Sequence, residues 1–143
     1  MADILLDTNI IIDFFEETRE FHQDALKLID AAISADWELN ITATTCKDSY
    51  YILTRLLGES TARNCLEAIF ATMELLPVDN RVCYDGFYSN EPDFEDAIIL
   101  SCAELNRMDY LISRDAKAFK NSKVPVLSPQ EMLEKHRFIN LPC

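Results

Sequence analysis

Short apolar or β-rich runs alternate along this chain with longer stretches of helical period, and this alternation constrains the fold more than any other feature. The runs predict strands at 4–6, 37–42, 74–78, 110–112 and 124–127. The helical stretches predict a short helix capped near Thr8 or Asn9, and further helices at 19–35, 44–57, 60–73, 80–89, 93–107 and 129–136. Strands separated by helices need crossover connections, which produce a mostly parallel sheet with helices on both faces. We therefore expect an α/β fold.

The length and charge of the chain limit the classes of function. Its 143 residues fit one domain covering 1–143. The 25 Asp and Glu residues outnumber the 13 Lys and Arg residues, and a net charge of −12 disfavours a generic duplex-binding protein or a binder of anionic membranes. A nucleic acid can still be the substrate if metal ions are recruited first.

Targeting and redox features are few. The first residues do not form a signal peptide, and no uncharged stretch approaches the ~18 apolar residues of a membrane span, so we expect a cytoplasmic protein with no membrane partner. The five cysteines are far apart and include no C-x-x-C pair. We expect them to be small core residues in a reducing compartment.

Acidic residues follow two of the predicted strands. Asp7 comes directly after 4–6, and Asp115 lies three residues beyond 110–112. The reactive site of a parallel α/β sheet lies at the carboxyl ends of its strands, so both acids are expected at the same rim. Asp93 and Asp96 share a face in the first turn of a helix, and Asp48 lies near the start of another. Taken singly, each of these acids could equally be a helix cap, a turn residue or a solvated side chain.

Convergence of these acids would require compensation. Two like charges about 4 Å apart repel by roughly 4 kcal/mol at an effective dielectric constant of 20. Such a cluster must bind protons or a hard divalent cation, and oxygen ligands favour Mg²⁺ or Mn²⁺. His22 and His136 are expected on helix surfaces away from this rim, which disfavours a histidine base.

Five segments, in order along nearly the whole chain, resemble the blocks of a known family, the PIN-domain ribonucleases, which include the VapC-type toxins. These segments are LLDTNI at 5–10, ITATTCKDSYY at 41–51, DFEDAI at 93–98, LISRD at 111–115 followed by Phe119, and VPVLSP at 124–129. The resemblance implies a three-layer α/β/α sandwich with a five-stranded, mostly parallel sheet, and cleavage of RNA that depends on Mg²⁺ or Mn²⁺.

The resemblance also implies roles for individual residues. Asp7, Asp96 and Asp115 would hold the metal. Asp48 stands where the family commonly has Glu, and Asp93 would be an accessory acid. Together with the three metal ligands, these two residues make five expected catalytic acids. Thr8, Asn9 and Ser113 would support them through hydrogen bonds.

The resemblance also implies partners, and two alternative functions remain open. Toxins of this family pair with a small antitoxin protein and often form homodimers, for which the aromatic residues at 14–15 or 50–51 could serve. Asp48 in place of Glu favours one alternative, a catalytically weak module that binds RNA or protein. Asp7 as a phosphoacceptor would suit another, an aspartate-based phosphohydrolase, although Asn9 stands where such phosphatases usually have a second Asp.

Positive charge gathers in one segment. Residues 114–123 contain Arg114, Lys117, Lys120 and Lys123 against Asp115, a local charge of 4 − 1 = +3. The strip begins beside a proposed metal ligand, so we expect these four side chains to contact an RNA backbone. An ordinary solvated loop is the alternative.

Overall fold

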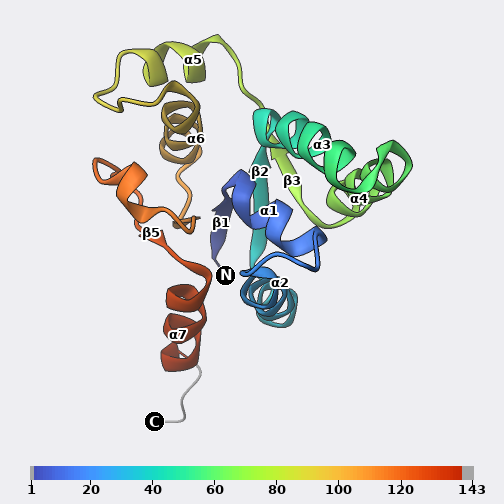
Figure 1. Cartoon of the computed structure of the whole chain (residues 1–143). Helices are drawn as coiled ribbons and strands as arrows, with labels where there is room; N and C mark the ends of the chain where they lie inside the picture. The colour runs from blue at the N-terminus through green and yellow to red at the C-terminus, as the bar shows by residue number, and fades with distance from the viewer. Residues whose placement is uncertain (1, 140–143) are drawn as a thin grey trace.

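The computed structural model describes residues 2–139, which form a five-stranded parallel sheet (Figure 1). The strands are β1 (Asp3–Leu6), β2 (Glu38–Thr42), β3 (Glu74–Leu76), β4 (Tyr110–Ile112) and β5 (Val126–Leu127). Their order across the sheet is β3-β2-β1-β4-β5, and every neighbouring pair is parallel. The predicted sheet is confirmed, with β1 at its centre.

Helices connect the strands. They are α1 (Thr8–Phe15), α2 (His22–Ala35), α3 (Ala43–Leu57), α4 (Glu59–Thr72), α5 (Asn80–Phe87), α6 (Phe94–Leu105) and α7 (Pro129–Ile139), with a short 3-10 helix, η1 (Ala116–Phe119). All seven predicted helices are present, and η1 was not predicted. Helix α2 begins at His22 rather than at residue 19, because the preceding residues form turns.

The cap of helix α1 differs from the prediction, and helix α3 has a side-chain cap of the same kind. Helix α1 is capped by Asp7, whose side chain accepts a hydrogen bond from the backbone of Thr8, and not by Thr8 or Asn9. Helix α3 is capped by Thr42, whose Oγ1 accepts a hydrogen bond from Thr45 N at 2.9 Å. A side-chain oxygen at the cap satisfies an amide that has no partner inside the helix.

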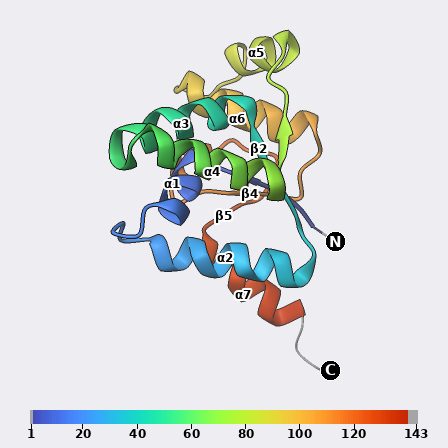
Figure 2. The ribbon, with the colours of Figure 1, turned by 90° about the vertical axis from the view of Figure 1, so that its right-hand side faces the viewer.

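The sheet is covered on both faces, which confirms the sandwich (Figure 2). Along β1, Ile4 and Leu6 belong to a core cluster shared with α1, α2 and α7, whereas Leu5 belongs to a second cluster shared with α5 and α6. This alternation follows from the two-residue period of a strand. A third, smaller core joins α1 to α3 and α4 around Ile12 and Leu53.

The structure bears on two further expectations, that the cysteines are core residues and that no segment spans a membrane. Cys65 and Cys102 are buried and Cys46 and Cys83 partly buried, as expected of core residues, while Cys143 lies outside the described residues. Within residues 2–139, the helices are too short or too polar to cross a membrane.

Candidate metal-dependent active site

Asp7 lies where β1 ends and α1 begins, at the centre of the sheet. Its Oδ1 accepts a hydrogen bond from Thr8 N at 2.8 Å, and its Oδ2 accepts one from Ser113 Oγ at 2.8 Å. The side chain is only 7% exposed, and no ion pair among residues 2–139 includes it. Burial raises the pKa of Asp7 above its ordinary value, and the negative charge of Asp115 adds to this, against the lowering by the two hydrogen bonds.

Ser113 connects β4 to this carboxylate. The hydroxyl of Ser113 donates to Asp7 and accepts a hydrogen bond from the backbone N–H of Asp115 at 3.0 Å. It therefore both orients Asp7 and fixes the start of the segment that carries Asp115. The predicted supporting role of Ser113 agrees with this geometry, although Asp115 itself is exposed.

The first turn of α6 brings two more of the predicted acids to this region. Asp93 caps the helix, with its Oδ1 accepting a hydrogen bond from Asp96 N at 3.2 Å. Desolvation, followed by the negative charges of Asp93, Asp7, Asp115 and Glu91, raises the pKa of Asp96 to about 6. The charges of Asp7, Asp93 and Asp115 thus act on Asp96, although three or more of these carboxylates are not gathered into one metal-binding group within the described residues.

A cavity of about 570 Å³ joins these elements to α3. Three of the five predicted acids line it: Asp7, Asp48 and Asp96. The polar residues Thr8 and Asn9 also line it, and Thr8 Oγ1 lies 3.0 Å from Thr45 Oγ1 of α3. Asp93 and Asp115 are not among the lining residues.

Glu95 and Lys47 also line the cavity, and the sequence interpretation missed both. Lys47 Nζ lies 3.7 Å from Asp48 Oδ1, so a cation already accompanies the acid that stands in the family's Glu position. The signal for both was their position beside a predicted acid, in the first turns of α6 and α3.

The predicted arrangement of metal ligands needs correction. In the described part of the chain, no group of three or more His, Cys, Asp or Glu side chains is placed to hold a metal ion. Asp7, Asp96 and Asp115 therefore do not form a closed shell as they lie, because Asp7 is turned to its two hydrogen-bond donors and Asp115 faces solvent.

Asp7 and Asp96 alone nevertheless suit a hard divalent cation. Mg²⁺ in proteins is commonly held by one or two carboxylates, with water and substrate phosphate completing its octahedron. Both acids line one cavity, and the pKa of Asp96 is raised first by desolvation and then by neighbouring negative charges that a cation would compensate.

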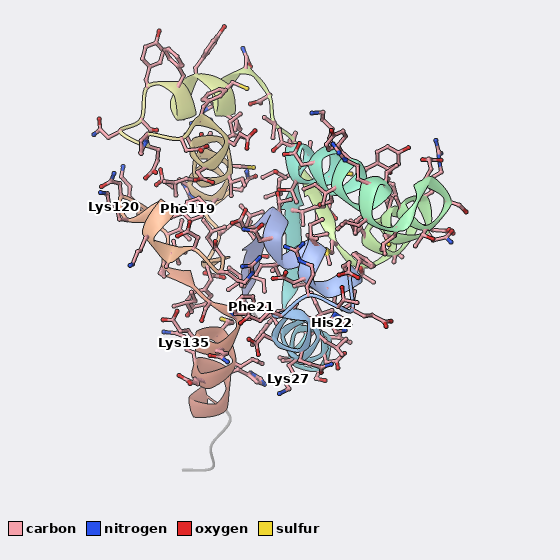
Figure 3. The ribbon with its side chains drawn as sticks, viewed as in Figure 1. Phe21, His22, Lys27, Phe119, Lys120 and Lys135 are labelled. Carbon is pink, nitrogen blue, oxygen red and sulfur yellow. The ribbon has the colours of Figure 1, made fainter. Side chains whose placement is uncertain are left out.

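A second buried acid lies on α1, and the sequence interpretation did not identify it. Asp13 is 1% exposed, and it forms ion pairs with Arg19 at 2.8 Å and with Arg114 at 2.6 Å. The guanidinium of Arg114 lies 4.7 Å from the ring centre of Phe21, and His22 Nδ1 lies 2.8 Å from the carbonyl oxygen of Asp13. Figure 3 shows Phe21 and His22 together where α2 begins.

This cluster changes the role predicted for Arg114. Its guanidinium is paired with Asp13 and lies over the ring of Phe21, with 25% of the side chain exposed, so an RNA phosphate would have to compete with Asp13 for it. The lysines of the predicted strip are exposed: Lys117, Lys120 and Lys123. Figure 3 shows Lys120 at the outer edge of the molecule beside Phe119, which anchors η1 with 2% of its surface exposed.

Comparisons with known proteins agree with this fold. A family model described as a PIN domain matches residues 3–117. Over 137 residues, the chain is 22% identical to Ribonuclease VapC1 of Aquifex aeolicus, covering 92% of this chain and 94% of that protein.

Chains in several solved structures are similar to this chain over most of their length. A toxin–antitoxin complex from Klebsiella pneumoniae contains a chain with 26% identity and a TM-score of 0.66, with 88% of this chain and 97% of that chain covered. VapC20 of Mycobacterium tuberculosis, a toxin that cleaves the sarcin–ricin loop, has a TM-score of 0.70 at 12% identity, with 82% and 94% covered.

Proposed function

The chain belongs to the PIN domain family, and we propose that it is an endoribonuclease that hydrolyses RNA phosphodiester bonds with the help of Mg²⁺ or Mn²⁺. One observation carries the proposal: Asp7 is buried at the carboxyl end of the central strand, forms no ion pair in the part of the chain that the structure describes, and shares a cavity with Asp48 and Asp96. The curated relative named as a ribonuclease supports the choice of RNA as substrate.

The proposed site holds its metal through Asp7 and Asp96. When bound, the ion lowers the pKa of a water molecule and neutralises charge on the scissile phosphate. Ser113 Oγ and Thr8 N keep the carboxylate of Asp7 in one orientation, so that it does not have to reorganise during the reaction.

Asp48 is the proposed base. Its carboxylate lies on the wall of the cavity formed by α3 and accepts the proton of the attacking water. Asp93 is the less suitable base, because its Oδ1 already accepts the amide of Asp96 as the cap of α6. Asp115 contributes negative charge from the end of β4, acting on Asp7 and Asp96.

A cleavage assay tests this function. The purified protein is incubated with several end-labelled RNAs in the presence of Mn²⁺, Mg²⁺ or a chelator, and Asp7→Asn serves as the inactive control. We expect discrete RNA fragments that require the metal. Binding of RNA without cleavage under all metal conditions would favour the weak or inactive binding module, and a phosphoryl group trapped on Asp7 would favour the phosphohydrolase.

The lysine strip on η1 is the proposed path of the RNA backbone. Lys117, Lys120 and Lys123 are exposed and follow directly from Asp115. Replacing Lys117 and Lys120 by Glu is expected to weaken RNA binding and to reduce its salt dependence, while the binding of Mn²⁺ is unchanged. Unchanged RNA binding would remove the strip from the proposal.

A protein partner is also proposed. Several structural neighbours are toxin–antitoxin complexes, including the one from Klebsiella pneumoniae. We infer that this chain acts as the toxin of such a pair, bound by a small antitoxin, and that it forms a homodimer. Co-expression with the protein encoded by the neighbouring gene, followed by light scattering of the purified complex, tests both partners.

A further inference from the structure

Two exposed aromatic rings line the same cavity as the carboxylates. Tyr51 on α3 is 59% exposed and Phe94 on α6 is 49% exposed. Figure 1 shows α3 and α6 on either side of the start of α1. The two rings thus border one cavity from two different helices, where one ligand can contact both.

The neighbour of Tyr51 shows that this exposure is specific. Tyr50 is partly buried, and its hydroxyl donates a hydrogen bond to Glu59 at the start of α4. Tyr51 instead lines the cavity. Arg55, which is not among the lining residues, donates a hydrogen bond to its hydroxyl at 2.9 Å and places its guanidinium 5.7 Å from the ring centre. The adjacent tyrosines therefore have different roles, with Tyr50 connecting two helices.

Phe94 is also held in place by a neighbour. Its ring packs edge to face with that of Phe87 at a centroid distance of 6.3 Å and an interplanar angle of 79°. A ring that is already held loses little conformational entropy when a ligand binds to it. Both walls of the cavity thus carry aromatic surfaces that are ordered before any ligand arrives.

The charge of the cavity decides which part of a nucleic acid these rings can bind. Its acids are Asp7, Asp48, Glu95 and Asp96, and the cation on its wall, Lys47, lies beside Asp48. Phosphate groups other than the one at the metal gain little binding free energy from this surface, because most of its charged side chains are negative. Stacking of a base on an aromatic ring does not depend on charge and contributes about 1–3 kcal/mol per base.

We propose that Tyr51 and Phe94 are stacking platforms for two unpaired nucleobases of the RNA, one on each side of the scissile phosphate. The inference rests on the proposed function, because it takes the cavity to be the site of cleavage. Bases of a duplex are stacked and paired, and they cannot reach the two rings without being unpaired first.

Binding of labelled RNA to the full chain tests the inference. The probes are a single-stranded RNA of 12 nucleotides (about the length that spans one such site), the same backbone lacking its bases, and a hairpin of equal length, measured by anisotropy without metal. The variants are Tyr51→Leu and Phe94→Leu, with Tyr51→Phe to restore the ring. Tyr88→Leu is the matched control, because Tyr88 is 81% exposed and does not line the cavity.

We expect Tyr51→Leu and Phe94→Leu each to weaken binding of the single strand by about tenfold, the lower half of the range for one stacked base. Tyr51→Phe and Tyr88→Leu should bind within about twofold of the unmodified protein. The backbone without bases should bind weakly and equally to all variants.

Two outcomes would overturn the inference. Tyr51→Leu and Phe94→Leu could bind the single strand like the unmodified protein, which would leave the rings to a protein partner, or Tyr88→Leu could weaken binding as much as they do. In either case, RNA cleavage by the unmodified protein would leave the proposed function intact. Failure of the unmodified protein to bind or cut any RNA would instead reject the proposed function itself.

Discussion

Helix α1 carries two buried aspartates, six residues apart, in opposite electrostatic situations. Asp13 lies between two guanidinium groups, which hold both of its carboxylate oxygens. Asp7 forms no ion pair within residues 2–139 and accepts hydrogen bonds from an amide and a hydroxyl, although it is almost as deeply buried. A carboxylate removed from water needs a cation within the protein, a proton, or a cation supplied from solution. The comparison separates an acid that is neutralised within the fold from one that is not.

The largest expected effect that separates the two acids is on catalysis. Asp7→Asn should reduce RNA cleavage by roughly 10²–10³-fold, because a metal-centred site contributes several kcal/mol and each 1.4 kcal/mol is a factor of ten. Single-turnover rates with saturating Mn²⁺ measure this, and circular dichroism checks the fold. Cleavage by Asp7→Asn at the unmodified rate would break the comparison, since Asp7 would then hold no metal.

The next effect concerns Asp13 and stability. Asp13→Asn should lower the free energy of unfolding by about 3 kcal/mol, because Arg19 and Arg114 both lose the charge that compensates them. Urea unfolding followed by tryptophan fluorescence measures the change. Asp30→Asn, on the exposed side of α2, is the control and should stay within about 0.5 kcal/mol of the unmodified protein. An equal loss in the two variants would contradict the assigned role of Asp13.

Asp96 should behave in the opposite way to Asp13. Its pKa is raised in the folded protein to about 6 from an ordinary value of 3.8, so ionised Asp96 disfavours the folded state above pH 6, and this penalty disappears as the pH falls from 6 towards 4. In metal-free buffer at pH 8, Asp96→Asn should therefore raise Tm by about 3 °C, which corresponds to roughly 1 kcal/mol once solvent screening is included.

Thermal scans at several pH values measure the effect of Asp96→Asn. The gain should shrink to nothing near pH 4, and Mn²⁺ should stabilise the unmodified protein more than the variant. A loss of Tm at pH 8 would show that Asp96 supports the fold as Asp13 does.

The smallest expected effect tests how much each of the two arginines contributes to compensating the charge of Asp13. Arg19→Ala should cost about 1 kcal/mol, because the arginine is 32% exposed and Arg114 still pairs with the carboxylate. RNA cleavage should be retained, since Arg19 lies away from the cavity residues. If Arg19→Ala unfolds the protein as readily as Asp13→Asn, Arg114 contributes less to the pair than its geometry indicates.

The elements of this fold could be predicted because their signals are local. The uncharged runs before Asp7 and Ser113 and the periodic stretch of α6 indicate their structures within a few residues. The position of Asp7 at the end of the central strand followed from a general rule on parallel sheets. The fold was therefore accessible from the sequence, and the rule indicated the rim at which a site is expected.

What could not be predicted depends on contacts between distant residues. Asp13 looked like an ordinary polar residue of a short helix, because its partner Arg114 lies 101 residues away. The same ion pair engages the guanidinium of Arg114, a member of the predicted strip. Thr8 and Asn9 seemed suitable caps for α1, but the extended backbone at Asp7 allowed its carboxylate to take that position.

The pairing of β1 with β4 also has a consequence in time. Asp7 and Ser113 are 106 residues apart, so at 5–20 residues per second a ribosome makes Asp7 about 5–20 s before the serine that orients it. Until then the central strand has an open edge on the side where β4 will pair. The hydrogen bond between Ser113 and Asp7 therefore cannot form until translation of the chain is nearly over.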